Sequence, residues 1–169
     1  MKLLDNETVT ALLAAAADSP RLRANHNIHP VLEDPVQRFF NAMQPGTYVR
    51  PHRHSTPPRW ELFVVLRGAM ALLVFDDSGR VAERQELKAE GPVFGAEVEA
   101  GRWHALVALQ PSVLFELKQG PYSALTDKDF ASWAPAEGEA NCAAVVRWYE
   151  QARVGDRIPA GIESHLQSK

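Results

Sequence analysis

Residues 46–68 read GTYVRPHRHSTPPRWELFVVLRG, and this stretch decides the fold. His52 and His54 are two residues apart, so on a β-strand their imidazoles point to the same face. The Ser-Thr-Pro-Pro sequence that follows favours a turn, which brings Glu61 back beside the two histidines. Neutral imidazole together with carboxylate suits zinc, iron, manganese and nickel. The stretch therefore predicts two neighbouring strands that hold part of a divalent-metal site.

A third histidine, His104, completes the expected ligand set. It stands in GRWHALVAL, where Gly101 favours a tight turn and His104 lies just inside the following strand. Three histidines and one glutamate leave room for water or substrate, as in catalytic rather than closed structural sites. The alternative is that the histidines are surface residues and Glu61 a solvated strand end. The combined spacing favours one divalent ion held by His52, His54, Glu61 and His104.

Short apolar runs alternate with turn residues between positions 36 and 120, a pattern typical of an antiparallel β domain. The expected strands are 36–43, 47–54, 60–67, 69–76, 80–88, 92–99, 102–109 and 112–119. About eight strands with no helix between them indicate a jelly roll or barrel. The sequence therefore predicts a mainly β fold, with residues 36–120 as the β-barrel.

Helices are expected on either side of this barrel. Asn6 or Thr8 can cap a helix that runs to about residue 17, and residues 21–35 read as an ordered loop or a short edge strand. Residues 126–130 look like the start of a helix, residues 139–153 read as a second helix, and about the last fifteen as a flexible arm. We expect residues 1–35 to pack on the barrel and residues 121–169 to form a C-terminal helical extension.

The composition excludes several classes of protein. The 169 residues carry a net charge of −3 with scattered lysines and arginines, which argues against a nucleic-acid binder. No stretch approaches the ~20 apolar residues of a membrane span, and no apolar run near the N-terminus resembles a signal peptide. The single cysteine, Cys142, is expected to be a buried structural thiol. The expectation is a cytoplasmic protein that binds neither nucleic acid nor membrane.

The metal motif resembles that of the cupin superfamily. The first cupin motif has Gly, five residues, His-x-His, a short spacer, Glu, six residues and Gly, and the matching positions are Gly46, His52, His54, Glu61 and Gly68. The spacer before Glu61 has six residues in place of three or four. In the second motif Gly101 and His104 match, whereas Glu99 and Ala108 replace the usual Pro and Asn. The resemblance implies a metal-binding cupin jelly-roll β-barrel.

A closer resemblance extends over nearly the whole chain. The segments SPRLRANHNIHP (19–30), DPVQRFFNAMQPGTYVRPHRH (34–54) and LKQGPYSALTDKDFASWAPAEG (117–138) look like the WbuC family of cupin-fold metalloproteins. Members of that family are found with bacterial O-antigen and surface-polysaccharide genes. The resemblance implies a link to nucleotide-sugar chemistry and no known reaction.

Three residues near the last predicted strand are candidates for catalysis. Alternation puts Leu114, Glu116 and Lys118 on one face of that strand and Val113, Phe115 and Leu117 on the other. If the polar face looks into the barrel, Glu116 and Lys118 can act as an acid–base pair, and the alternative is a solvated ion pair. Tyr122 can act as a general acid or base at the cavity mouth, or pack against the C-terminal segment.

Other residues are candidates for substrate or subunit contacts. Arg50 and Arg59 bracket the metal motif and can hold an anionic substrate, with surface salt bridges as the alternative. His26 and His29 can contact substrate from a lid over the barrel, or belong to a loop held by Asn side chains. Dimers are common for this fold, so a homodimer is expected, and Phe39, Phe115 and Leu117 suit either its interface or the core.

Two functions are compatible with these residues. The first is a metal-dependent isomerase or epimerase, hydrolase or dioxygenase that acts on a sugar or nucleotide-sugar in surface-polysaccharide (O-antigen) biosynthesis. The metal (zinc, iron, manganese or nickel) would activate a substrate oxygen or a water molecule. The second is a non-catalytic module that binds a metabolite and holds a structural metal. In both cases the expected partner is a small molecule.

Overall fold

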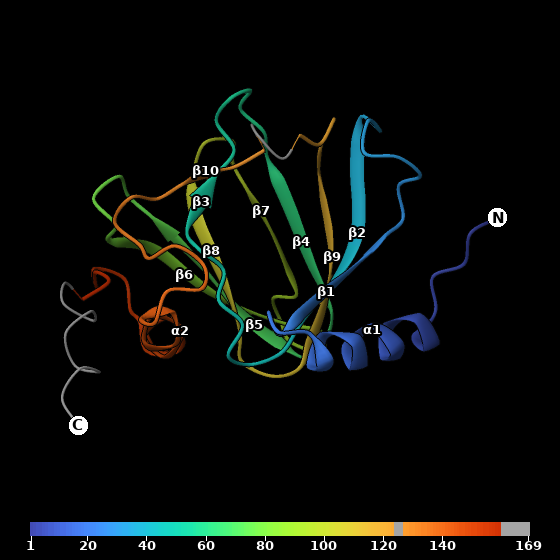
Figure 1. Cartoon of the computed structure of the whole chain (residues 1–169), viewed down its shortest axis with the longest axis horizontal. Helices are drawn as coiled ribbons and strands as arrows, with labels where there is room; N and C mark the ends of the chain where they lie inside the picture. The colour runs from blue at the N-terminus through green and yellow to red at the C-terminus, as the bar shows by residue number, and fades with distance from the viewer. Residues whose placement is uncertain (124–126, 160–169) are drawn as a thin grey trace.

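Two five-stranded antiparallel sheets face each other in the computed structural model, which describes residues 1–123 and 127–159. Sheet A has the order β1-β2-β9-β4-β7 and sheet B the order β10-β3-β8-β5-β6 (Figure 1). Sheet A contains β1 (Arg23–Asn27), β2 (Val36–Met43), β9 (Ser112–Gln119), β4 (Glu61–Arg67) and β7 (Gly95–Val98). Sheet B contains β10 (Asp129–Phe130), β3 (His52–Arg53), β8 (Trp103–Ala108), β5 (Ala69–Phe75) and β6 (Val81–Lys88). The two sheets form the predicted jelly roll but do not close into a continuous barrel.

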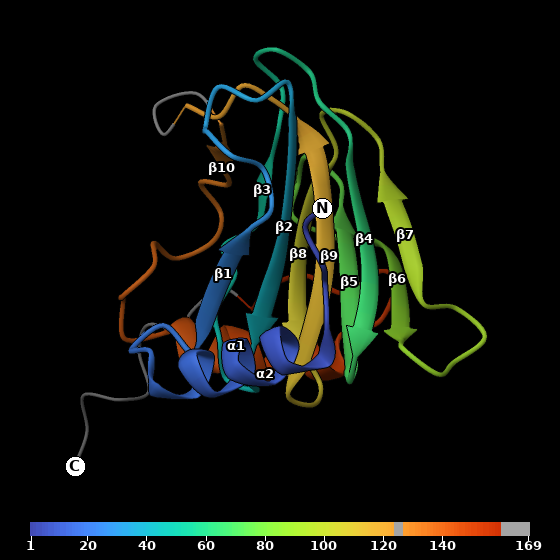
Figure 2. The same cartoon turned by 90° about the vertical axis from the view of Figure 1, so that its right-hand side faces the viewer.

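The core lies in three layers. One layer fills the space between the two sheets, and one further layer covers the outer face of each sheet. The seven residues of β5 are all buried, which explains why this strand reads as an uninterrupted apolar run. Leu72 packs between the sheets, whereas Leu73 packs outside sheet B against helix α2 (Cys142–Gln151). Helix α1 (Asn6–Asp18) covers the outer face of sheet A through Val9 and Leu12 (Figure 2). The apolar core fills only one end of the space between the sheets and leaves the other end to polar residues.

The N-terminal segment joins the β structure. Helix α1 (Asn6–Asp18) is capped by Asp5 in place of the predicted Asn6 or Thr8, because the Asp5 carboxylate accepts the Thr8 N–H at 2.8 Å. Residues 23–27 then form β1, the edge strand of sheet A, which confirms the edge-strand alternative. No helix in residues 1–123 or 127–159 is long and apolar enough to cross a membrane.

The predicted helix at residues 126–130 is wrong for the part that the structure describes. Asp129 and Phe130 form β10, which pairs with β3, and the Ala131 N–H donates to the Pro51 carbonyl at 2.9 Å. Partners far away in sequence therefore override the local helix signal. Thr126, the expected cap, and most of the predicted C-terminal arm lie outside the described residues. The second helix is shorter than predicted, with α2 limited to Cys142–Gln151.

The proposed outer surface of the barrel needs one correction. Phe39 does not lie on the outside, because the β2–β9 register pairs it with Glu116 on the inner face, where both line a cavity. Phe40 takes the outer position instead and packs edge-on against Phe115, with ring centroids 6.0 Å apart. Phe115 and Leu117 are half-buried on this outer face. A homodimer through that face stays a prediction.

Gly68 makes the tight turn between β4 and β5, and its replacement by alanine is expected to be destabilising. Its φ of +81° is unfavourable for other residues, and an added Cβ would lie 2.4 Å from the Pro111 carbonyl oxygen. We expect Gly68→Ala to lower the free energy of unfolding by more than about 2 kcal/mol, measured by denaturant titration. Gly101→Ala is the control, since Gly101 has a similar φ of +78° but no neighbouring atom within 4 Å of an added Cβ. Equal losses for both variants would contradict the close-approach argument.

Candidate metal centre and active site

Four buried side chains converge at the polar end of the space between the sheets. His52 lies in β3, His54 directly after it, Glu61 at the start of β4 and His104 in β8. Their ligand atoms all lie within 4.8 Å of one another. His52 and His104 are direct cross-strand partners, and the Ser55–Pro58 bridge turns the chain back so that Glu61 faces them from sheet A. The structure thus brings together all four residues that were expected to hold a metal.

Backbone carbonyls fix the orientation of the three imidazoles. The Nδ1 atoms of His52 and His104 lie 3.0 Å from the carbonyls of Arg50 and Arg102, and Nδ1 of His54 contacts the Asp127 carbonyl. A carbonyl can only accept, so each Nδ1 carries a proton and each Nε2 of a neutral ring offers a lone pair. Burial, followed by the charge of Lys128, lowers the pKa of His52 well below its usual value. His52 is therefore in the neutral, metal-binding form.

The carboxylate of Glu61 fits a cation. Its Oε2 lies 3.2 Å from Nε2 of His54 and 3.0 Å from Nε2 of His104, an arrangement that brings lone pairs together unless a proton or metal ion lies among them. Its Oε1 is buried and has no hydrogen-bond partner within residues 1–123 and 127–159. Burial opposes ionisation, but the contacts with His104, His54 and Glu116 outweigh it and lower the pKa of Glu61. These donors suit one divalent ion.

Glu116 and Lys118 lie beside this group on β9, as alternation predicted. The register pairs Lys118 with Glu61 and Glu116 with Phe63. Burial, reinforced by the charge of Glu61, raises the pKa of Glu116 well above its usual value, which favours the protonated form of this carboxyl. Asn41 donates to Glu116 Oε2 at 3.1 Å. Burial acts to lower the pKa of Lys118, but the charge of Glu61 and the ion pair with Asp127 act against it, and that pKa is raised. The surroundings of both groups therefore favour their protonated forms next to the metal group.

Two residues that sequence reasoning missed come from the segment after the barrel. Asp127 accepts from Lys118 Nζ at 2.6 Å and lies 3.7 Å from Arg59, while its carbonyl contacts His54. Lys128 lines the same cavity. The charged run Asp127-Lys128-Asp129 is visible in the sequence, but it was interpreted as a helix start. No local pattern indicates that this run returns to the metal group.

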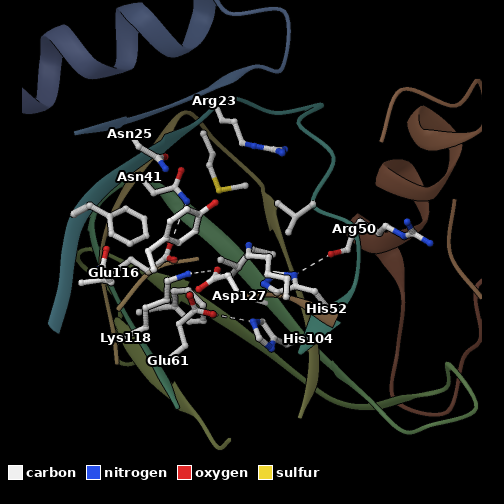
Figure 3. Close-up of a pocket in the computed structure, with 18 of the residues that line it drawn as sticks. Arg23, Asn25, Asn41, Arg50, His52, Glu61, His104, Glu116, Lys118 and Asp127 are labelled. Atoms are coloured by element: carbon white, nitrogen blue, oxygen red, sulfur yellow. Dashed lines mark hydrogen bonds and ion pairs between the residues drawn. The ribbon is translucent and has the colours of Figure 1, made fainter. Parts of the chain in front are cut away.

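The cavity is not lined by all four candidates for substrate binding, which are Arg50, Arg59, His26 and His29. Arg59 is buried, donates to the Pro121 carbonyl at 2.8 Å, and is not among the described residues that line the cavity. The Arg50 guanidinium is directed away from His52 in Figure 3 and donates to the Ala131 carbonyl at 2.8 Å. His26 stacks on Phe40, away from the cavity, whereas His29 is buried in the cavity wall.

A cavity of about 650 Å³ extends from the metal group toward β1. Glu61, His52 and His104 gather at one end of it, and Arg23 and Asn25 lie at the other (Figure 3). Tyr122 is 39% exposed at the cavity, with its ring centroid 5.6 Å from Lys118 Nζ. The wall also contains polar side chains from β1 and β2, namely Asn25, Asn27, His29, Gln37 and Asn41. This volume falls in the range of pockets that bind drug-sized ligands.

Comparisons with known proteins agree with this architecture. A family model described as "Domain of unknown function (DUF6016)" matches residues 4–87, which include three of the four residues of the metal group. Protein TT1209 from Thermus thermophilus is similar in structure, with a TM-score of 0.51 and 20% identity over 70% of this chain and 97% of that one. CapF, solved with the inhibitor 3-isopropenyl-tropolone, has a TM-score of 0.53 and 15% identity over 67% of this chain and 32% of that one.

A further structure with some similarity belongs to a named superfamily. It is a cupin superfamily protein from Desulfitobacterium hafniense DCB-2, with a TM-score of 0.46 and 15% identity over 57% of this chain and 76% of that one. Identities this low concern the fold alone. The two facing sheets and the similarity to TT1209 and CapF show the jelly-roll fold that the sequence predicts. Within that fold, its buried His/Glu group is able to hold a metal.

Proposed function

We propose that this protein is a metal-dependent enzyme that acts on a sugar or nucleotide-sugar substrate in surface-polysaccharide (O-antigen) biosynthesis. The observation that carries the proposal is the convergence of His52, His54, Glu61 and His104 beside the buried Glu116 at the base of a cavity. A divalent ion held by these four residues would polarise a substrate oxygen or lower the pKa of a bound water. A closed structural site would not need a cavity of this size beside it.

Proton transfer is the chemistry that the neighbouring side chains support best. Burial next to Glu61 raises the pKa of Glu116, and the surrounding acids raise the pKa of Lys118, so both sites favour the protonated form. They are two residues apart on β9 and face the same cavity, so both can reach one bound ligand. Tyr122 lies above Lys118 and can take part in the same transfer. Among the candidate reactions, we therefore favour isomerisation or epimerisation over hydrolysis or dioxygenation.

The opposite wall of the cavity suits a hydroxyl-rich ligand. Asn25 pairs with Asn41 across β1 and β2, and Asn27 pairs with Phe39, so amides and an aromatic ring form one surface. Amides can donate to and accept from sugar hydroxyls. β1 and β4 are three strand spacings apart in sheet A, so Asn27 in β1 is separated from Glu61 in β4 by about 14 Å across the sheet. A ligand that contacts both ends is longer than a single metal-bound group, as a nucleotide-sugar is.

The pathway is the part of the proposal that depends on family resemblance. Residues 19–30, 34–54 and 117–138 resemble the WbuC family, whose members occur with O-antigen genes. These segments contain most of the cavity wall, namely β1, β2, β3, the end of β9 and the Asp127–Phe130 segment. The resemblance therefore concerns the residues that would contact a substrate.

Glu116→Gln is the variant that tests the enzyme proposal. Glutamine resembles the protonated acid in shape but cannot transfer its proton, so metal content and thermal stability should stay unchanged. Turnover of a panel of UDP-, dTDP- and GDP-sugars by metal-loaded protein, followed by NMR, should fall by about 100-fold or more. Equal turnover by the variant would contradict the role of Glu116. Binding of panel members by the unaltered protein without turnover would instead favour a metabolite-binding module.

A further inference from the structure

Lys128 is held beside the metal group by strand pairing. Phe130 in β10 lies directly opposite His52 in β3, and both line the cavity. In an extended segment, residues two apart point to the same side, so Lys128 projects to the cavity side with Phe130. Lys128 is half-buried and lines the cavity. Its ammonium group therefore faces the space in front of the metal ligands.

The positive charge of Lys128 has no counter-charge of its own among residues 1–123 and 127–159. Lys118 is matched by Asp127 at 2.6 Å, and Arg21 and Arg23 are matched by Glu137 at 2.7 and 2.8 Å. Lys128 forms no ion pair within 4.0 Å with any residue in the described parts of the chain. Glu116 accepts a hydrogen bond from Asn41, and Glu61 faces the histidines. A half-buried ammonium group without a paired acid has a free-energy cost, and binding of an anion beside it lowers that cost.

The direction of the pKa shift of Lys128 agrees with the absence of a paired acid in the described residues. Burial lowers the pKa of Lys128 below its usual value, although the charge of Glu61 acts in the opposite direction, and the charge of Lys118 lowers it further. The nearby acids therefore do not compensate for the burial of this ammonium group.

We propose that Lys128 binds an oxyanion, a carboxylate or a phosphate, on the part of the ligand that occupies the metal group. The end of the substrate that reacts is then anionic, as in a sugar acid or a sugar phosphate. This inference rests on the proposed metal centre and narrows its substrate class. It also gives the C-terminal extension a part in substrate binding, since Lys128 lies beyond the last strand of the predicted barrel.

The test measures binding of two anions to metal-loaded, full-length protein. Isothermal titration with oxalate and, separately, with inorganic phosphate is carried out on the unaltered chain, Lys128→Met, Lys128→Arg and Lys88→Met. Lys88 is an exposed lysine on β6 whose side chain is 53% exposed, and it serves as the matched control. We expect Lys128→Met to weaken binding of at least one anion by about tenfold or more, with Lys128→Arg between it and the unaltered chain. Lys88→Met should bind like the unaltered chain. The anion with the larger loss identifies the group, carboxylate or phosphate, that the site accepts.

Metal content and thermal unfolding are measured on every variant first, so that two kinds of failure are distinguished. If the unaltered chain takes up no divalent metal, the proposed function fails. If metal is retained but oxalate and phosphate bind equally to the unaltered chain and to Lys128→Met, the inference on Lys128 is overturned. Failure of both anions to bind the metal-loaded, unaltered chain overturns it as well. Should Lys128→Met not fold, Lys128→Gln replaces it in the same comparison.

Discussion

The His52→Ala/His54→Ala variant is expected to lose essentially all of the about one equivalent of divalent metal that we expect the unaltered chain to bind. These residues supply two of the four donors, and the remaining Glu61 and His104 come from facing sheets with no other donor of the group. Elemental analysis of protein purified without a histidine tag, after reconstitution with iron, manganese, nickel and zinc, measures this directly. A double variant that folds and keeps its metal would refute the assignment.

The same substitution should abolish stabilisation by metal. An ion that binds only the folded state at 100 times its dissociation constant stabilises that state by about 2.7 kcal/mol. The unaltered chain should therefore melt at a higher temperature when metal is added, whereas the double variant should not respond. His26→Ala is the control, because His26 is an exposed histidine that stacks on Phe40 outside the cavity. It should keep both the metal and the stabilisation.

Asp127→Ala is expected to lower the free energy of unfolding by about 3–5 kcal/mol. The substitution leaves the buried ammonium of Lys118 without its partner at 2.6 Å and removes the carboxylate that lies 3.7 Å from Arg59. Lys118 and Asp127 are both almost fully buried, so water cannot replace the lost interaction. Denaturant titration of the metal-free protein measures the loss without a contribution from bound metal.

Glu83→Ala is the matched control for Asp127→Ala. Glu83 pairs with Arg102 at the same N–O distance of 2.6 Å, but its side chain is 67% exposed. This loss should stay below about 1 kcal/mol, because water screens exposed pairs. The Lys118→Met/Asp127→Ala double variant no longer contains the unpaired ammonium of Lys118, and only Arg59 lacks the carboxylate, so its stability should exceed that of Asp127→Ala. A double variant that is less stable than Asp127→Ala would show that the loss has another origin.

Sequence alone was sufficient for the elements whose signals are local. The spacing of His52 and His54 on one strand, and the alternation that turns Glu116 and Lys118 inward, follow from the two-residue period of a β-strand. The turns after His54 and at Gly101 have their own sequence signals, and they bring Glu61 and His104 to the same point. Most strand positions in residues 36–119 were predicted for the same reason, because each strand carries its own pattern of apolar residues.

Register and long-range pairing were decided only in the tertiary structure. Phe39 and Phe40 are equally apolar neighbours, and only the pairing of β2 with β9 turns Phe39 toward Glu116 and Phe40 outward. Asp127 and Lys128 reach the metal group because β10 pairs with β3, across more than 70 residues of chain. The direction of the Arg50 side chain depends likewise on the Ala131 carbonyl. A strand's own residues determine which of them share a face, but the partner strand determines what that face meets.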